Sequence, residues 1–502
     1  MAQSQSKPNL LFLYTDQQRF DTLRCYGNHQ IQVPNLNALA GESCVFENAY
    51  VTQPVCTPSR ASTLTGLYPH SHGCDRNNAH LASEIPTLAE MVPDDYLRAN
   101  YGKWNLGDEV IAQHGFTDWV SIEDYYRGYY SREEYLSILS SYHHFLLENG
   151  FEPDYERAGV RLFDRVKAAL LPEPFTKARF LGREAARFIR ESATGQRPFV
   201  LIVNFIEPHT PYVGRLGDLY RPEDLPAAPH FRQKPPPEAA LVNRMLADHY
   251  MDRGSLYGHD LTTDIGCRRI WAQYWGNITL VDRAAGDILQ ALSETGLDDR
   301  TIVVFSSDHG DMMGDHGLFE KCVLYEEAVR VPLLVRVPWL RRAPRSIPGR
   351  ISQIDLVPTL LDLLGLPAPA GLEGESRAAV LQGEPLTGND VFIEWNGPDG
   401  RPSRLFGTGD AHLKEPLSAA ARDQAQEWEP VRGPWRSVVS AEGWKLNLSA
   451  TDQCELYDLN ADPHELQNLF GEPKQQKRIR DLAERLQKWQ AQTGDPVRLP
   501  AL

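Results

Sequence analysis

The sequence has few cysteines and no arrangement of them that would suggest a disulfide framework or a thiolate zinc site. Its 502 residues include seven cysteines, an odd number spread over the whole chain. None are paired at the Cys-x-x-Cys spacing of zinc sites, and small disulfide scaffolds have far denser cysteines. We therefore expect neither a disulfide scaffold nor a zinc site built from thiolates.

Long apolar runs are also missing. The N-terminal stretch MAQSQSKPNLLFLYTDQQ has one lysine and then only five apolar residues, 10–14. Such a run is too short for the core of a signal peptide or for a membrane span. The expectation is a cytoplasmic protein without a membrane partner.

Basic residues are outnumbered by acidic ones. The chain has 51 Lys and Arg against 67 Asp and Glu, and its formal net charge is −16. Nucleic-acid binding depends on clustered Lys and Arg at the phosphates, so this balance argues against nucleic acid as a partner. It does not argue against a small anionic substrate, because the charge inside a pocket is set locally.

Short buried runs alternate with helical patterns along the first three quarters of the chain. A chain of this length suits two or three domain-sized units. Continuous apolar runs at residues 10–14, 199–205, 301–305 and 331–335 are typical of strands buried on both faces of a parallel sheet. Helical patterns at 85–92 and 276–295 separate them. This alternation predicts a doubly wound α/β domain with a mostly parallel sheet flanked by helices.

Two long segments interrupt this pattern, near residues 120–195 and 212–263, and long loops at strand ends often select substrates. Inside the first, a capping box of Ser131 and Glu134 predicts a helix over 131–149. From about residue 390 the character changes: 391–395, 435–440 and 444–448 resemble strands, and 474–493 a closing helix. We predict a catalytic domain over 1–388 and a smaller α+β domain, with an antiparallel sheet, over 389–502.

The most specific stretch of the chain starts at Cys56 and reads CTPSRASTLTGLYPHSHG. Pro58 is tolerated in a first helical turn, and apolar residues then recur at helical spacing. The Cys56 thiol is thus predicted at a helix N-terminus, an end that attracts anions. Arg60 adds a fixed positive fork beside it.

This stretch resembles the signature of the type I sulfatase family, a branch of the alkaline phosphatase superfamily. The resemblance implies that a formylglycine-generating enzyme oxidises Cys56 to formylglycine, the nucleophile of that family. The segment from Cys454 to Leu469 is similar to the family's C-terminal signature. The resemblance covers both ends of the chain and most core strands, but not the two long segments.

Two acidic motifs at strand ends predict a metal site. Asp16-Gln17 and Asp308-His309 each follow a buried run, and ligands gather at the carboxyl ends of parallel strands. Two carboxylates, an amide oxygen and an imidazole suit one divalent cation. The resemblance implies that this cation orients the sulfate and the formylglycine. The oxygen-rich set favours Ca²⁺, while His309 allows Mn²⁺ or Zn²⁺.

Further residues match family motifs. The resemblance implies that Arg60, Lys103 and Lys321 balance charge on the sulfuryl oxygens. It also implies that His209 protonates the leaving alcohol. Asn77 and Asn105 occupy positions of substrate contacts.

Asn105 departs from the family pattern, because relatives usually carry a histidine there that acts as a base. Asparagine cannot act as a base near neutral pH, so either Asp308, His316 or water replaces it, or the preferred ester differs. Phosphonate monoester hydrolases also lack that histidine and share the metal pairs found here. They usually lack, however, the residues found here as Lys103 and Ser59.

The favoured function is therefore hydrolysis of a sulfate monoester to an alcohol and inorganic sulfate. The alternative is a phosphonate monoester or phosphodiester hydrolase that uses the same nucleophile. A non-catalytic binding protein and a phosphatase with a Ser or Thr nucleophile are further options, which the intact Cys-x-Pro-x-Arg motif disfavours. We also expect a homo-oligomer; the sequence does not identify the alcohol.

Overall fold

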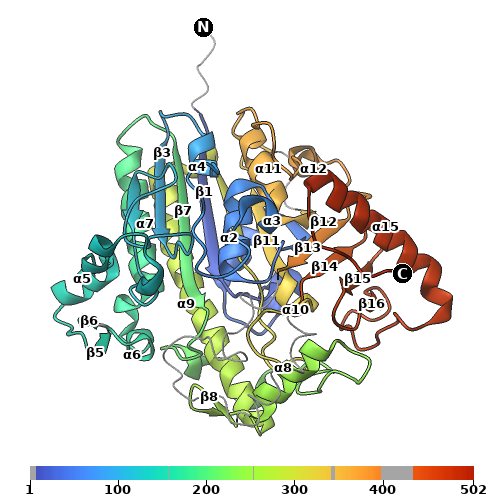
Figure 1. Ribbon diagram of the computed structural model, residues 1–502. Helices are drawn as coiled ribbons and strands as arrows, with labels where there is room; N and C mark the ends of the chain where they lie inside the picture. Colours follow the sequence, from blue (N-terminus) through green and yellow to red (C-terminus); the bar gives the residue numbers. More distant parts are fainter. Residues whose placement is uncertain (1–6, 158, 253, 341–344, 397–432) are drawn as a thin grey trace.

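The computed structural model describes residues 7–157, 159–252, 254–340, 345–396 and 433–502 (Figure 1). An eight-stranded sheet forms its centre, in the order β12-β2-β11-β10-β1-β7-β3-β4. Its strands in chain order are β1 (Asn9–Asp16), β2 (Cys44–Tyr50), β3 (Leu97–Gly102), β4 (Asp118–Val120), β7 (Phe199–Pro208), β10 (Thr301–Ser307), β11 (Arg330–Arg336) and β12 (Arg345–Ser352).

The sheet is mostly parallel, as predicted. β1 pairs in parallel with β10 and β7, and β3 pairs in parallel with β7 and β4. The prediction for 331–335 is wrong in direction, because β11 runs antiparallel to both β10 and β2. A continuous apolar run reports burial on both faces, and an antiparallel strand inside a covered sheet has the same burial.

Helices cover both faces of the sheet, which confirms the predicted α/β class (Figure 1). α9 contacts both α1 and α7, and α7 and α9 pack on β7, whereas α2 and α11 pack together in front of the sheet. The helices of this part are α1 (Pro34–Gly41), α2 (Cys56–Thr65), α3 (Pro69–His72), α4 (Leu88–Met91), α7 (Lys177–Ala193), α9 (Asp264–Thr295), α10 (Glu326–Val329), α11 (Leu356–Leu363) and α12 (Ala378–Gln382).

The helix predicted over 131–149 is wrong in its first half. Residues Glu133–Ser137 form a short 3-10 turn, and α5 spans only Ser141–Glu148. The Ser131 hydroxyl donates to Asp108 instead of capping a helix, and Ser140 accepts the N–H of His143 as the actual N-cap. The capping pattern thus identified the right kind of element but the wrong start, because a tertiary contact took up Ser131.

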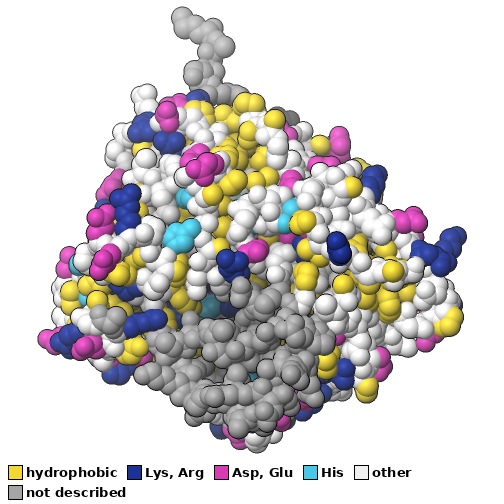
Figure 2. Space-filling model, in the orientation of Figure 1, with side chains coloured by type: hydrophobic (Ala, Val, Ile, Leu, Met, Phe, Trp, Pro, Cys, Tyr) yellow, Lys and Arg dark blue, Asp and Glu magenta, His cyan; other side chains and the backbone are white. Residues whose placement is uncertain are grey.

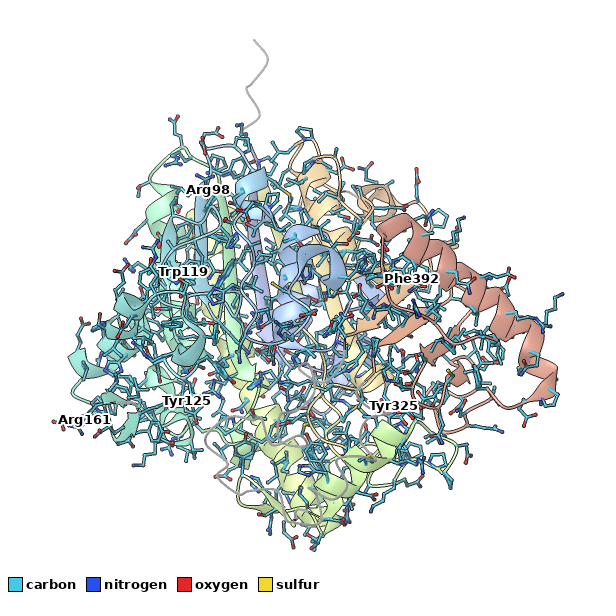
Figure 3. All side chains as sticks on the ribbon, in the orientation of Figure 1. Arg98, Trp119, Tyr125, Arg161, Tyr325 and Phe392 are labelled. Carbon is cyan, nitrogen blue, oxygen red and sulfur yellow. The ribbon has the colours of Figure 1, made fainter. Side chains whose placement is uncertain are left out.

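The two long segments contain small elements of their own. The first holds the hairpin of β5 (Tyr155–Arg157) and β6 (Val160–Leu162), and helix α6 (Arg165–Ala169). Tyr125 and Arg161 mark this region at the lower left of Figure 3. Its range also includes α7, which packs on the central sheet. The second segment holds α8 (Leu241–Asp252), β8 (Ser255–Leu256) and β9 (His259–Asp260).

A smaller antiparallel sheet follows in the C-terminal part, in the order β13-β14-β15-β16. It is closed by α15 (Gln476–Thr493), as the sequence predicted. Leu446, Leu486 and Trp489 belong to a hydrophobic cluster distinct from the main core. The exact domain boundaries stay a prediction. The strands are β13 (Val391–Trp395), β14 (Trp435–Val439), β15 (Trp444–Ser449) and β16 (Glu455–Asp458).

The cysteines and the surface agree with the composition. All seven cysteines lie in the described residues, and none of them forms a disulfide bond. On the face shown in Figure 2, acidic and basic side chains are interspersed. In the part of the chain that the structure describes, no helix combines the length and the hydropathy that a membrane span requires.

Candidate active site

Cys56 is the first residue of α2 and is buried. This confirms the helix start predicted from Pro58, whose missing N–H costs nothing in a first turn. Burial and the charge of Asp16 oppose ionisation of the thiol, but nearby cations, Lys103 foremost, lower the pKa of Cys56 below its ordinary value. The thiol therefore lies where negative charge is stabilised.

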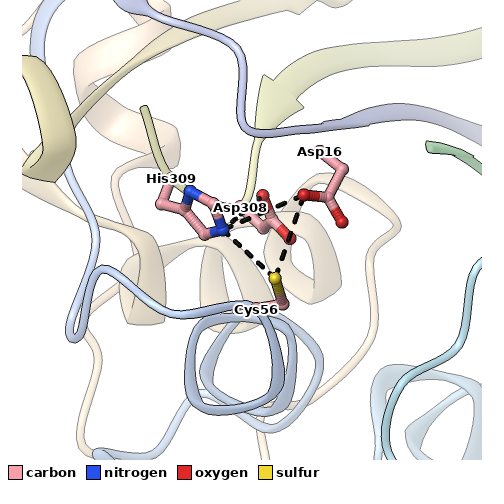
Figure 4. Close-up of side chains that lie close together, drawn as sticks. All are labelled: Asp16, Cys56, Asp308 and His309. Carbon is pink, nitrogen blue, oxygen red and sulfur yellow. Dashed lines mark hydrogen bonds and ion pairs between the residues drawn. The ribbon is translucent and has the colours of Figure 1, made fainter. Parts of the chain in front are cut away.

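Four side chains of types that bind metals meet at the strand ends (Figure 4). Asp16 ends β1, and Asp308 and His309 directly follow β10. One ligand atom from each of these three and from Cys56 lies within 4.8 Å of the others. The Nε2 atom of His309 is 3.3 Å from the Cys56 Sγ, 3.6 Å from an Asp308 oxygen and 3.9 Å from an Asp16 oxygen.

The ring of His309 is oriented as a metal ligand requires. Its Nδ1 lies 2.9 Å from the carbonyl oxygen of Gly310. A carbonyl only accepts, so Nδ1 carries a proton, and Nε2 is the nitrogen that faces the carboxylates and would bind a metal. Two buried carboxylates and this imidazole form a donor set that fits a divalent cation.

Arg60 donates hydrogen bonds to both carboxylates of the site. Its Nε donates to Asp308 at 2.9 Å, and one terminal nitrogen donates to Asp16 at 3.1 Å. The other terminal nitrogen donates to the carbonyl of Lys103 and to the side chain of Asn204. With its donors used in this way, Arg60 acts on the site by holding the metal-site carboxylates in place.

Lys103 supplies a second fixed positive charge. Its Nζ is 2.5 Å from an Asp16 oxygen. Burial opposes both charges, yet the lysine holds the pKa of Asp16 well below its usual value, and Asp16 raises the pKa of Lys103. Both groups are therefore charged at neutral pH.

Gln17 is turned toward the site by its own hydrogen bonds. Its backbone adopts a left-handed conformation with φ of 68°, and its N–H donates to Asp308 at 3.0 Å. Its amide nitrogen donates to Tyr212 and Asp311, which directs the amide oxygen toward the Nζ of Lys321 at 2.5 Å. The structure thus brings the predicted ligand Gln17 and the predicted clamp Lys321 together.

His209 is buried at the same site. Its Nδ1 is 2.9 Å from the carbonyl oxygen of Thr210 and must donate to it. Burial and then the charge of Lys321 push the pKa of His209 well below its ordinary value, although Asp16 acts in the opposite direction. The ring is therefore neutral in the free protein.

The two predicted substrate contacts, Asn77 and Asn105, bond to the start of α2. The exposed Asn77 accepts the N–H of Thr57 at 3.1 Å. The buried Asn105 donates its side-chain amide to the Thr57 hydroxyl, which in turn donates to the Asn105 carbonyl at 2.9 Å. Both residues therefore position the turn that carries the nucleophile.

Sequence reasoning misplaced one residue and missed others. His316, a candidate for the missing base, lies in a separate cluster described below. The buried carboxyl of Glu109 accepts the N–H groups of Trp104 and Asn105, and burial raises its pKa to about 7. Glu109 closely follows Lys103 and Asn105, and Asp311 closely follows Asp308 and His309. Both could have been found by searching for buried acidic residues near these predicted site residues.

Comparison with known proteins gives consistent matches over nearly the whole chain. The family model described as Sulfatase matches residues 8–366. The multifunctional alkaline phosphatase superfamily protein PehA of Trinickia caryophylli is 28% identical, covering 98% of this chain and 96% of that protein. The uncharacterized sulfatase YidJ of Escherichia coli is 28% identical, covering 93% and 84%.

A solved structure extends the likeness to the fold. The phosphonate monoester hydrolase SpPMH of Silicibacter pomeroyi superposes with a TM-score of 0.77 at 22% identity. The superposition covers 97% of this chain and 96% of that one. The same overall fold therefore serves a phosphonate hydrolase and, through the family model, sulfatases.

Proposed function

Because this chain belongs to the sulfatase family and is thus a sulfuric ester hydrolase, we propose that it cleaves a sulfate monoester into an alcohol and inorganic sulfate, with a nucleophile derived from Cys56. One observation carries this proposal. The Cys56 Sγ lies 3.3 Å from His309 and 3.9 Å from Asp16, at a helix N-terminus surrounded by fixed cations. A nucleophile, a metal donor set and positive charge at one point suit attack on an anionic ester.

Two groups added to the chain would complete the site. Formylglycine at position 56, when hydrated, supplies one hydroxyl that attacks sulfur and a second whose deprotonation releases sulfate. A divalent cation held by Asp16, Gln17, Asp308 and His309 would supply Lewis acidity. We propose Ca²⁺ for this position, with Mn²⁺ or Zn²⁺ as the ions that the imidazole also permits.

The fixed charges of the chain supply the electrostatics. Arg60, Lys103 and Lys321 bring three cations to a site with two carboxylates, Asp16 and Asp308. The chain as a whole is strongly acidic, so this local excess selects an anionic group. Arg60 and Lys103 are buried, Lys321 is half-buried, and hydrogen bonds hold all three. These charges therefore need little reorganisation when negative charge develops on the sulfuryl oxygens.

His209 would return a proton to the leaving alcohol. Its Nδ1–H is held by Thr210, so Nε2 is the atom available for proton transfer. Burial, and then the charge of Lys321, hold the pKa of the free ring well below its ordinary value, so the ring is neutral. The negative charge of a bound ester would raise the pKa of His209, and we propose that the ring gains its proton together with the substrate.

A phosphonate monoester or phosphodiester remains the alternative substrate class. The Asp-Gln and Asp-His pairs, Asn105 and the SpPMH fold favour it, whereas Lys103 and the sulfatase family model favour a sulfate ester. A sulfate monoester, a phosphonate monoester and a phosphodiester each carry one negative charge at neutral pH. The choice between them is therefore one of geometry at the same nucleophile.

The decisive experiment compares an aryl sulfate, an aryl phosphonate monoester and an aryl phosphodiester carrying the same leaving alcohol. The protein is produced with a formylglycine-generating enzyme, and mass spectrometry of the peptide containing Cys56 reports the conversion. We expect the highest kcat/KM for the sulfate. A higher kcat/KM for the phosphonate would show that the protein is a phosphonate hydrolase rather than a sulfatase. Full turnover by protein in which Cys56 is unconverted would exclude formylglycine as the nucleophile.

A further inference from the structure

A second buried cluster of histidines and carboxylates is separate from the cluster that contains Cys56. It contains His230 from the second long segment, Asp315 and His316 from the loop after β10, and Glu327 of α10. We propose that His230, His316 and Glu327, with Asp315 as a fourth ligand, form a structural site for a transition-metal ion of the Zn²⁺ type. This inference does not depend on which ester the protein cleaves.

The spacing of the donor atoms suits such an ion. One ligand atom each of His230, His316 and Glu327 lies within 4.8 Å of the others. The Nε2 of His230 is 2.9 Å from a Glu327 oxygen and 3.7 Å from an Asp315 oxygen. Bonds of 2.0–2.1 Å at tetrahedral angles separate ligands by roughly 3.3 Å, a value between these two distances.

The same side chains carry polar atoms that the described protein leaves without hydrogen bonds. The four residues are between 0% and 4% exposed. Among the described residues, no hydrogen-bond partner reaches Nε2 of His316 or the second Glu327 oxygen, and the Asp315 carboxylate has only the ion pair with Arg19 and the more distant ring of His230. Buried polar atoms are costly unless they are bonded, and a metal ion would use several of these at once.

The backbone holds the ligands in place before any ion binds. The His316 N–H donates to the carbonyl of His230 at 3.1 Å, and Phe231 pairs with Asp315 in an isolated β-bridge. The ring of His316 also stacks on Tyr325 at a centroid distance of 3.9 Å. Tyr325 is labelled in Figure 3 at the lower right of the molecule. Two imidazoles fixed side by side require little ordering on binding.

The ligand types distinguish this site from the catalytic one. Two imidazoles with carboxylates are the donors that Zn²⁺ and its neighbours in the first transition series prefer, whereas Ca²⁺ takes oxygen ligands. Arg19 lies 2.9 Å from Asp315 and shares that carboxylate's charge, which makes Glu327 the principal anionic ligand.

The cluster joins parts of the molecule that are distant in sequence. The half-buried ring of His464, from the C-terminal part, packs 4.6 Å from the ring of His230. Arg19 also donates to the carbonyls of Asp311 and Met312, and the side chain of Asp311 binds Gln17 at the catalytic site. An ion here would stabilise the loop that supports Gln17.

A proton is the competing occupant. The hydrogen bond between His230 and Glu327 is the pair expected when His230 is protonated and no metal is bound. Metal binding would displace that proton, so the two occupants differ in metal content and not in fold.

The test measures metal content and thermal stability of the full chain. The catalytic ion is first removed by Asp308→Asn, and this protein is chelated and then titrated with Zn²⁺ alone. We expect this metal-free protein to take up one Zn²⁺ ion per chain and to gain thermal stability, since an ion that binds the native state stabilises it. Adding His230→Gln to the same background should abolish both effects. The exposed His144→Gln, which lies outside the cluster, should leave both unchanged.

Two further measurements guard against misfolding. If His230→Gln does not fold, Glu327→Gln, which keeps the shape of the side chain, takes its place. Crystals of the wild-type chain soaked in Zn²⁺ should give an anomalous peak among His230, His316 and Glu327. The proposal is overturned if no such peak is found, or if Zn²⁺ uptake by the Asp308→Asn protein survives the cluster substitutions, since the cluster would then hold only a proton or water.

Discussion

The two buried histidine–carboxylate clusters of this protein are built in opposite ways. At the catalytic cluster, cationic side chains reach the carboxylates directly, Arg60 reaching both Asp16 and Asp308. At the second cluster, one arginine, Arg19, contacts one carboxylate, and Nε2 of His316 and one Glu327 oxygen have no hydrogen-bond partner among the described residues. The first arrangement stabilises added negative charge, and the second stabilises added positive charge.

This difference separates a site for an anionic substrate from a site for a cation alone. The catalytic ligands come from the ends of two adjacent parallel strands, where α/β sheets gather their ligands. The ligands of the second cluster come from a loop, a long segment and a short helix. The following predictions test whether this contrast in charge and position determines what each cluster does.

The largest effect is expected from removing the nucleophile of the catalytic cluster. Cys56→Ala should lower kcat/KM by about 10⁴-fold or more, because the group that attacks sulfur is gone. The far-ultraviolet circular dichroism and the melting temperature should stay close to those of wild type. Cys25→Ala, at an exposed cysteine, is the matched control and should keep full activity. Turnover by the Cys56→Ala protein near the wild-type rate would exclude a role for this residue in the chemistry.

The next largest effect is expected from replacing a metal ligand, and the same kind of substitution is compared at the two clusters. Asp308→Asn should lower activity by about 10³-fold, since Lewis acidity is worth several kcal/mol of transition-state stabilisation. His230→Gln should lower it by less than about tenfold, because His230 reaches the catalytic site only through intervening residues. Activity and bound metal are measured on the same samples. Equal activity losses in the two variants would contradict the separation of roles.

Removal of the Arg60 side chain should lower the stability of the protein as well as its catalytic activity. Arg60→Met leaves Asp16 and Asp308 buried without their shared partner, and breaking a buried pair costs about 3–5 kcal/mol. Chemical denaturation of the chelated protein should show this loss, and saturating Ca²⁺ or Zn²⁺ should recover part of it by restoring positive charge. A loss that no divalent ion reduces would mean that Arg60 acts by packing alone.

Much of the fold and of the catalytic cluster could be predicted because both leave local signals. The apolar runs at 10–14 and 301–305 became β1 and β10, and the strand-end position of Asp16 and Asp308 placed them together. The direction of β11 could not be predicted, since burial is the same in either direction. The helix expected from Ser131 failed because Asp108, remote from that motif, took its hydroxyl.

The second cluster left no local signal. His230 lies in a segment outside the family resemblance, and its partners are about 85 to 97 residues away in the chain. The sequence offers His316 only as one candidate for the missing base of the catalytic site. The ring of His316 stacks on Tyr325, and its backbone N–H bonds to the His230 carbonyl. Both contacts depend on the tertiary structure, which the spacing of residues along the chain does not predict.

Glu109 offers a pH-dependent test at the edge of the catalytic cluster. Burial raises its pKa to about 7 from an ordinary value near 4.5. The unfolded chain therefore releases this proton first as pH rises. The protonated Glu109 therefore contributes fully to the free energy of unfolding below about pH 4.5. This contribution, about 3 kcal/mol, is lost as the pH rises from about 4.5 to 7. Glu109→Gln should remove this slope from the free energy of unfolding measured by denaturation at several pH values. The exposed Glu148→Gln should retain it, and a slope that persists in Glu109→Gln would assign it to another group.

The smallest effect concerns the histidine that the catalytic cluster lacks. Relatives place a base where Asn105 binds the Thr57 hydroxyl, so release of sulfate should limit turnover. Rapid mixing with an aryl sulfate should then show a burst of alcohol before a slower steady rate. Asn105→His should raise the steady rate by less than about tenfold, because general-base catalysis, worth about 10²–10⁴, shows only until another step becomes limiting. Asn105→Gln, which keeps an amide, should give no gain. If no burst occurs and histidine adds nothing, release is not limiting. Asn105 then serves only to hold the Thr57 turn, and the phosphonate alternative gains weight.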